Sequence, residues 1–159
     1  MTTKINQVDH VWKIAEKIKT CMPVTLPAGK LRSRPMHTMP DREAGYLRFI
    51  TDHRGAKDEE IRAAPDVCLG FADTASNTYL SVTGCAEMFH DVAKARELWC
   101  TETQAWWPKG PTDPGVCVLR VTPEEANARG NSITVALKLF AARLSGHPPD
   151  LGENKKVQM

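Results

Sequence analysis

The apolar positions at the start of the chain follow a helical period. They recur at spacings of three and four residues, which places them on one face of a helix: Val8, Val11, Trp12, Ala15 and Ile18. Pro23 ends this helix, because proline lacks the N–H group that a helix interior needs. A short extended stretch at 24–26 follows, and the segment 27–40 is rich in proline, glycine and arginine.

Four later segments have the pattern of β-strands. They are 46–51, 67–72, 78–84 and 116–122, each six or seven residues long. β-Branched and aromatic residues are frequent in them, and Gly, Pro, Asp or Asn residues bound them, as is typical of strands. The turn at 73–77 is short enough to join the second and third segments as a hairpin.

Two helices are expected between these strands. A short helix at 57–64 stops at Pro65. Asp91 can cap a second helix over 92–100, in which apolar residues again recur at helical spacing.

Two more helices are expected in the C-terminal part. Thr122-Pro123-Glu124-Glu125 has the pattern of a helix start, with a capping Thr, Pro at the first helical position and Glu three residues after the cap. A last helix is expected over about 132–145, where Gly146 and two prolines end it. The polar tail 151–159 is expected to be loose.

The elements together predict an α+β fold around a small antiparallel barrel. The 159 residues suit one domain over 1–159, with 1–7 and 151–159 expected to be loose. Hydrophobic residues make up 42% of the chain and charged residues 25%, which excludes a fully disordered protein. The formal net charge of +2 lacks the strong basic field of a nucleic-acid binder.

Cysteines and histidines do not have the spacing of a metal or disulfide site. The five cysteines form no C-x-x-C pair, and no two of the five histidines lie within four residues of each other. A structural zinc site is therefore not expected. No secretory signal and no membrane span are found, so a cytoplasmic protein with reduced thiols is expected. The motifs of serine esterases, zinc proteases, P-loop enzymes and Rossmann dehydrogenases are also absent.

Two segments place cations where an anion could bind. In the first, 31–36, Arg32 and Arg34 flank a serine, and the planar guanidinium group suits phosphate oxygens. The second, 49–57, leads from a predicted strand into a predicted helix, a turn that can present backbone N–H groups to an anion. Taken alone, the simpler interpretations are a solvated basic loop and a polar turn.

A third segment, 105–115, holds two adjacent tryptophans in a loop rich in proline and glycine. Trp106 and Trp107 cannot both enter one helix face, so at least one is expected to be partly exposed, at an interface or against a flat ligand. The alternative is that both cap the end of the barrel.

Taken together, the three segments resemble the pyridoxamine 5′-phosphate oxidase-related family, specifically its general stress protein branch, whose members are FMN-binding split β-barrels. The resemblance spans about residues 8–150, and its tryptophan–glycine–Asp-Pro stretch is quite specific. The matching motifs run in family order: Ser33-Arg34-Pro35-Met36, Phe49-Ile50-Thr51-Asp52 with Lys57, Tyr79-Leu80-Ser81-Val82-Thr83-Gly84-Cys85-Ala86, Leu98-Trp99, Ala105-Trp106-Trp107-Pro108, Gly110, Asp113-Pro114, Val118-Leu119-Arg120-Val121 and Pro123.

The resemblance implies a small antiparallel split β-barrel with flanking helices, and a homodimer with FMN at the subunit interface. By this analogy Arg34 and Lys57 would hold the FMN phosphate. The backbone around Met36, Ile50 and Thr51 would meet the edge of the flavin ring.

The analogy also adds Pro35, Arg54, Trp106 and Trp107 to the expected cofactor-binding residues. Trp106 or Trp107 would reach the flavin from the partner subunit. Pro35 lies within the matched Arg-Pro-Met step, and Arg54 could compensate for Ala56, which stands where the oxidases tend to have a second cation.

Besides Ala56, the chain departs from the family pattern at two places. The true oxidases carry an Arg-x-His substrate segment near the C-terminus, and this chain has none, so oxidation of vitamin B6 is not expected. An aromatic-Trp-Asp motif of many members is replaced here by Asn127-Ala128-Arg129.

The resemblance therefore implies an FMN-binding flavoprotein of the stress-associated type, in which the flavin supplies oxidoreductase chemistry. It assigns no substrate, no redox partner and no catalytic side chain, and no nucleic-acid or membrane partner is expected. Two alternatives stay open: a non-enzymatic flavin-binding or storage protein, and a split barrel that binds another flat cofactor such as haem or a deazaflavin.

Overall fold

The computed structural model describes residues 2–54, 57–130 and 134–138. Its first element is the helix α1 (Thr2–Ile18), which confirms the helical period of the apolar positions. Val11, Trp12, Ile14 and Ala15 are all buried on its inner face. Burial of this face against the strands holds the helix in place, since an isolated helix of this length is marginal in water.

The strands form an antiparallel sheet with the order β2-β1-β6-β7-β8-β5-β4, in which β3 also pairs with β1 and β9 with β8. Their bounds are β1 (Thr20–Thr25), β2 (Arg32–Ser33), β3 (Met36–His37), β4 (Met39–Asp41), β5 (Tyr46–Asp52), β6 (Asp66–Asp73), β7 (Thr78–Phe89), β8 (Val116–Arg129) and β9 (Thr134–Lys138). Short helices connect them: α2 (Lys57–Ala63), α3 (Val92–Glu97), α4 (Thr101–Trp106) and a 3-10 turn at Pro27–Gly29.

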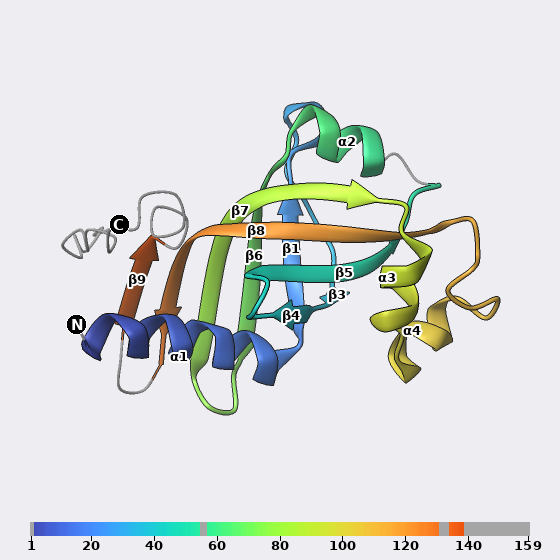
Figure 1. Ribbon diagram of the computed structural model, residues 1–159. Coiled ribbons are helices and arrows are strands. Elements are labelled where there is room, and N and C mark those ends of the chain that lie inside the picture. Colours follow the sequence, from blue (N-terminus) through green and yellow to red (C-terminus); the bar gives the residue numbers. More distant parts are fainter. Residues whose placement is uncertain (1, 55–56, 131–133, 139–159) are drawn as a thin grey trace.

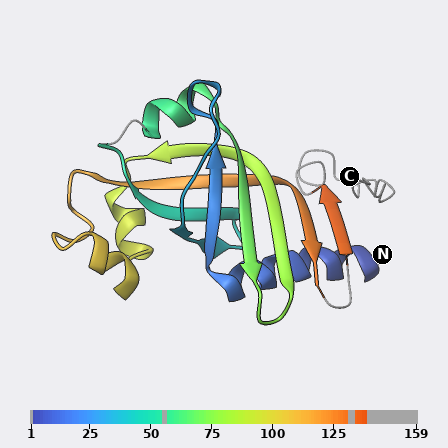
Figure 2. The same ribbon diagram turned by 180° about the vertical axis from the view of Figure 1, so that it is seen from behind.

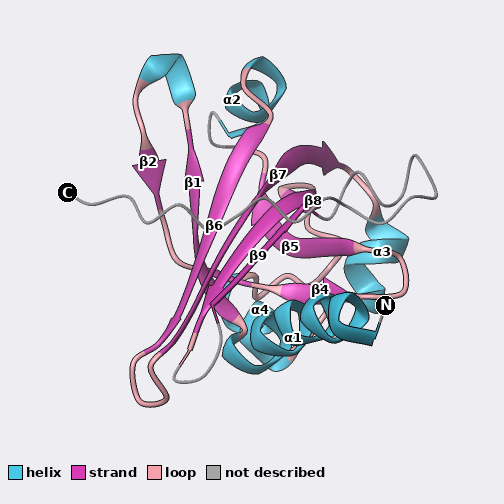
Figure 3. Ribbon diagram, turned by 90° about the vertical axis from the view of Figure 1, so that its left-hand side faces the viewer, coloured by secondary structure: helices cyan, strands magenta, loops and turns pink. Residues whose placement is uncertain are grey.

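The two longest strands, β7 and β8, bend along their length (Figure 1). The first part of β7, from Thr78 to Cys85, pairs with β6. The first part of β8, from Val116 to Val121, pairs with β5. Because of this bend, β1 and β6 lie on one side of the barrel and β5 and β4 on the other, with α1 along its lower side (Figures 1 and 3).

Two hydrophobic clusters form the core, and β5 contributes to both. Phe49 is fully buried in the main cluster, which also contains the inner face of α1. Its neighbour Ile50 belongs to a second cluster with Ala95, Val116 and Val118. Successive side chains of a strand point to opposite faces, so β5 is buried on both. The second cluster attaches α3 and α4 to the side of the barrel away from the N-terminus (Figure 2).

The helix predicted to start at Pro123 is wrong, because β8 continues as a strand to Arg129. Ala126 and Ala128 are buried and alternate with exposed or half-buried neighbours, which is the period of a strand. Pro123 lies opposite Gly84, where the β7–β8 register shifts. A proline is tolerated at such a bulge because the ladder is interrupted there. Pairing with β7 therefore overrides the local capping pattern.

The helix predicted over 132–145 is also wrong where the structure describes it, because β9 (Thr134–Lys138) pairs with β8 from Arg129 back to Glu125. The rest of that prediction, like the tail 151–159, lies outside the described residues. The helix predicted over 92–100 is present as α3 but ends earlier, at Glu97, and the separate helix α4 over Thr101–Trp106 was not predicted. The Asp91 carboxylate caps α3 by accepting from the Lys94 N–H group at 2.9 Å.

Candidate functional site

The fold brings the Arg34 side chain to α2. Its Nη2 atom lies 3.8 Å from Oε2 of Glu60, in the helix that begins at Lys57. The backbone explains this position: Arg34 lies between β2 and β3, which both pair with β1, and its N–H group donates to the Pro23 carbonyl at 3.4 Å. Two cations that are distant in the sequence therefore belong to neighbouring elements.

The guanidinium group of Arg34 keeps hydrogen-bond donors available. Its side chain is 34% exposed, and its 3.8 Å separation from Glu60 is longer than a hydrogen bond. Among the described residues, this ion pair is the one interaction of the Arg34 side chain. The group is thus oriented by a carboxylate without being saturated by it.

The predicted ring-edge residues lie in two neighbouring strands. Met36, in β3, pairs with Cys21 and is half-buried against the main core, whereas Pro35 before it is exposed. Ile50 and Thr51 are buried in β5. Strand β3 contacts β5, so the backbones of both segments lie close together.

One edge of β5 is covered only in part. The described strand β4 pairs with β5 from Tyr46 to Arg48. The opposite edge of β5 pairs with β8 as far as Asp52. No described strand pairs with the first edge of β5 at Ile50.

Arg54 makes different contacts from Arg34. Its side chain holds the Asp52 carboxylate, with Nη2 at 2.8 Å from Oδ2 and Nε at 3.0 Å from Oδ1. It also lies 3.6 Å from Asp113. The hydrogen bond from the Arg54 side chain is the main reason that the pKa of Asp52 is lowered. These contacts tie the end of β5 to the loop at 113–115.

The two adjacent tryptophans are in different environments. Trp106, at the end of α4, is 80% exposed. Trp107 packs against the second core cluster, and its ring centroid lies 6.4 Å from that of Trp99. The sequence-based expectation that at least one tryptophan is exposed is therefore confirmed.

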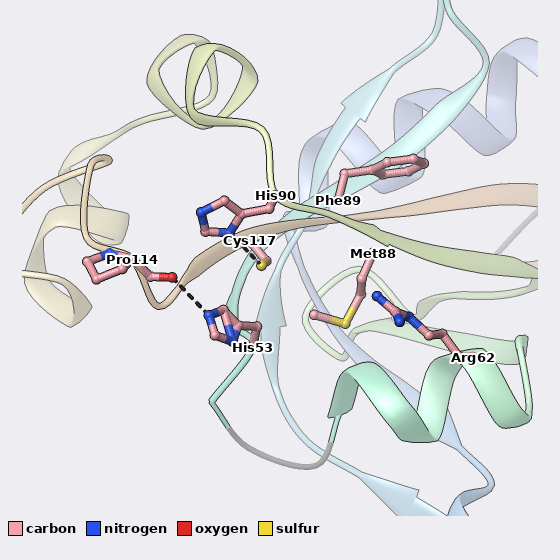
Figure 4. A pocket seen from close by; sticks show the side chains of 7 residues that line it. All are labelled: His53, Arg62, Met88, Phe89, His90, Pro114 and Cys117. Atoms are coloured by element: carbon pink, nitrogen blue, oxygen red, sulfur yellow. Dashed lines mark hydrogen bonds between the residues drawn. The ribbon is translucent and has the colours of Figure 1, made fainter.

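A pocket of about 420 Å³, for which the sequence carries no signal, lies where β5 and β7 end and β8 begins (Figure 4). Its lining residues are His53, Arg62, Met88, Phe89, His90, Pro114 and Cys117. His53 Nε2 lies 2.9 Å from the Pro114 carbonyl oxygen, and Cys117 Sγ lies 3.5 Å from His90 Nδ1. No sequence spacing could reveal this group, because only the strand pairing brings its members together.

Two further observations concern metals and membranes. No group of three or more His, Cys, Asp or Glu side chains in the described part of the chain is placed to hold a metal ion. Within the same residues, no helix combines the length and the apolar character needed to cross a membrane.

Comparison with solved structures identifies the fold. A protein from Clostridium acetobutylicum related to general stress protein 26 superposes with a TM-score of 0.74 at 21% identity, over 86% of this chain and 96% of that one. General stress protein 26 from Bacillus anthracis gives 0.72 at 20% identity, over 87% and 100%. The general stress FMN/FAD binding protein from Xanthomonas citri gives 0.69 at 24% identity, over 86% and 98%.

A search of curated protein sequences found no significant match. The model of the family described as "Pyridoxamine 5'-phosphate oxidase like" matches residues 6–150, which is most of the chain. The expected fold, an antiparallel split β-barrel with flanking helices, is confirmed by the sheet and by its structural neighbours. The chain therefore belongs to the pyridoxamine 5′-phosphate oxidase-like family.

Proposed function

We propose that this protein is an FMN-binding flavoprotein with oxidoreductase function, in which Arg34 and Lys57 hold the FMN phosphate. The observation that carries the proposal is the position of Arg34 beside α2, the helix that begins at Lys57. A terminal phosphate needs charge-assisted hydrogen bonds, and the guanidinium of Arg34 has donors to supply them. A structural neighbour from Xanthomonas citri is described as FMN/FAD binding, and one from Nostoc punctiforme as FMN binding.

The flavin ring would lie along the backbone of β3 and β5. The uncovered edge of β5 at Ile50, next to Met36 in β3, offers peptide groups to the polar rim of the ring. The side chains of Ile50 and Thr51 on this backbone are buried. When bound, the flavin supplies the electron transfer, and these residues bind it, orient it and exclude water.

A second copy of the chain would complete the site. We propose a homodimer with FMN at the interface, in which Trp106 reaches the flavin of the partner subunit. Its ring is 80% exposed, whereas the Trp107 ring packs against the core of its own subunit. The protein is proposed to be cytoplasmic, because five cysteines that form no disulfide in the described residues suit a reducing compartment.

Titration of flavin fluorescence tests the phosphate assignment. Lys57→Ala and Arg34→Ala should each weaken FMN binding about ten- to a hundredfold, since a charge-assisted hydrogen bond contributes about 1.5–3 kcal/mol. Riboflavin, which lacks the phosphate, should bind the parent poorly and respond little to either substitution. Arg32→Ala is the matched control, because Arg32 lies two residues away and is exposed in β2.

Unchanged FMN affinity in folded Lys57→Ala and Arg34→Ala variants would contradict the phosphate assignment, and circular dichroism establishes that the variants are folded. The absorbance spectrum of the purified protein is an independent test. Flavin bands support the proposal, whereas a Soret band would show that the barrel holds haem instead.

A further inference from the structure

Cys117 combines a buried position with access to the pocket. The residue is 5% exposed in β8, and its side chain lines the pocket at the end of the barrel. It pairs with Thr51 of β5, and the next residue, Val118, pairs with Phe89 of β7. His90 follows Phe89 directly, so strand register places its imidazole next to the thiol, with Nδ1 at 3.5 Å from Sγ (Figure 4).

The other four cysteines, all within the described residues, lack an imidazole partner. Three of them are hydrogen-bonded to hydroxyl groups: Cys21 to Thr38, Cys68 to Ser81 and Cys100 to Thr103. Burial raises the pKa of Cys21 to about 12. Burial raises the pKa of Cys85 too, with a further contribution from nearby carboxylates, Glu124 first. Cys117 is therefore the one of the five cysteines with an imidazole, that of His90, beside its thiol as a proton acceptor.

Among the described residues that line the pocket, three besides the thiol titrate or carry charge: His53 just after β5, Arg62 from α2 and His90 just after β7. None of the described residues that line it is acidic, in contrast to the surroundings of Cys85. The His53 and His90 rings lie edge to face, with their centroids 5.8 Å apart.

We propose that Cys117 is a nucleophilic thiol which hydroperoxides oxidise to a sulfenic acid inside this pocket, with His90 as the proton acceptor. The thiol proton passes to His90 Nδ1, and the thiolate is the nucleophile. A pocket of about 420 Å³ has room for hydrogen peroxide or a small alkyl hydroperoxide.

The reaction balances without a further component. The Cys117 sulfur attacks the terminal oxygen of the hydroperoxide, the S–O bond forms and the O–O bond breaks. The leaving oxygen takes the electron pair of that bond and the proton held on His90, and departs as water or an alcohol. Sulfur is oxidised by two electrons, the peroxide is reduced by two, and the product is the sulfenic acid, the first step of cysteine oxidation. Flavin takes no part, so the proposal does not rest on FMN binding.

Site-resolved trapping tests the proposal on the full-length protein. The protein is treated with hydrogen peroxide in the presence of dimedone, and peptide mass spectrometry follows the adduct at each of the five cysteines. The rate at Cys117 should exceed the rates at Cys21 and Cys85 by about tenfold or more, because reactivity follows thiolate character and access. His90→Gln should lower the Cys117 rate by about tenfold and leave the rates at Cys68 and Cys100 unchanged.

His53→Gln is the matched control, since it changes a histidine of the same pocket but keeps the His90–Cys117 contact. It should retain most of the Cys117 rate. An equal loss in both variants would overturn the proposal, because the shape of the pocket and not the His90 imidazole would then set the reactivity. The oxidation rates of the five cysteines in the parent protein test the proposal without any variant. A Cys117 rate no higher than that of Cys21 would also overturn the proposal.

Discussion

At the scale of single residues, Arg48 is a charged side chain that is almost completely buried. It is 8% exposed in β5 and pairs with Asp41 at the end of β4, and the Asp41 carboxylate also accepts from the Ala44 N–H group at 2.9 Å. These two hydrogen bonds, with that from Ala44 the larger cause, hold the pKa of Asp41 below its usual value near 3.8. The ion pair thus connects the two strands beside the β4–β5 turn and neutralises the buried charge of Arg48.

The lowered pKa of Asp41 predicts how stability depends on pH. Its folded pKa is below the unfolded one, so its contribution is fully present above about pH 4 and is lost as the pH falls through the folded pKa. Asp41→Asn should cost about 1–3 kcal/mol at neutral pH, because Arg48 loses its carboxylate partner. The free energy of unfolding in denaturant, measured from pH 7 to pH 3, should show the gap between variant and parent closing as the pH falls.

Glu43→Gln provides the comparison for this effect. Glu43 lies in the same turn and is exposed, so its replacement removes a carboxylate but leaves the Asp41–Arg48 pair intact. A constant gap between Asp41→Asn and the parent over the whole pH range would show that Asp41 acts through packing rather than through its charge.

At the scale of elements, the sequence predicts a helix or strand correctly where the tertiary contacts of the segment favour the same structure as its local pattern. The apolar period of α1 matches its buried face, and that of β6 matches its buried side. β5 is also correctly predicted as a strand, although it is buried on both faces. The sequence at Thr122-Pro123-Glu124-Glu125 is a good helix start by itself, but β7 pairs with it over a long edge. Local capping contributes about 1 kcal/mol, and this cannot outweigh the pairing of a long strand.

The β7–β8 bulge predicts a strict requirement for glycine. A methyl group at Gly84 would run into the backbone carbonyl of Thr122, whose carbon would be 3.0 Å away. Gly84→Ala should therefore lower the free energy of unfolding by about 1–3 kcal/mol, because backbone in the middle of two long strands must shift. Denaturant titration followed by circular dichroism measures the loss.

Gly70→Ala in β6 is the matched control for the bulge. The nearest atom to its added methyl group would be the Met22 carbonyl oxygen at 3.9 Å, an ordinary contact. Its stability should stay within about 0.5 kcal/mol of the parent. Equal stabilities of the two alanine variants would show that the bulge can relax, and would contradict the assigned role of Gly84.

At the scale of the whole molecule, the sequence could identify the family and the two cationic segments, but not how these segments lie relative to each other in space. The motif around Arg34 and the motif before Lys57 were recognisable, whereas the contact of Arg34 with Glu60 depends on the pairing of β1 with both β2 and β3. The pocket at Cys117 gave no sequence signal, since its members come from α2, β7, β8 and the loops beside them. Strand register is a long-range property, and a local pattern does not contain it.

The two adjacent tryptophans predict separable effects on assembly and on stability. Sedimentation of the parent at micromolar concentration should give roughly twice the chain mass of 17.6 kDa. Trp106→Ala should leave the stability of the subunit unchanged, because the side chain is 80% exposed, but should weaken FMN binding about three- to tenfold through the lost aromatic contact. Trp107→Ala should instead lower the free energy of unfolding by about 1–3 kcal/mol, because its ring packs on Trp99 and the second core cluster.

The contrast between these two variants distinguishes a shared site from a site within one subunit. If the flavin lies at the interface, FMN affinity and dimer mass depend on Trp106 and fall together as the protein is diluted, since one copy supplies the cations and the other the aromatic ring. A monomer that still holds FMN would exclude this arrangement. So would a Trp106→Ala variant with unchanged affinity and unchanged mass, because Trp106 is the one of the two tryptophans that its own subunit leaves uncovered.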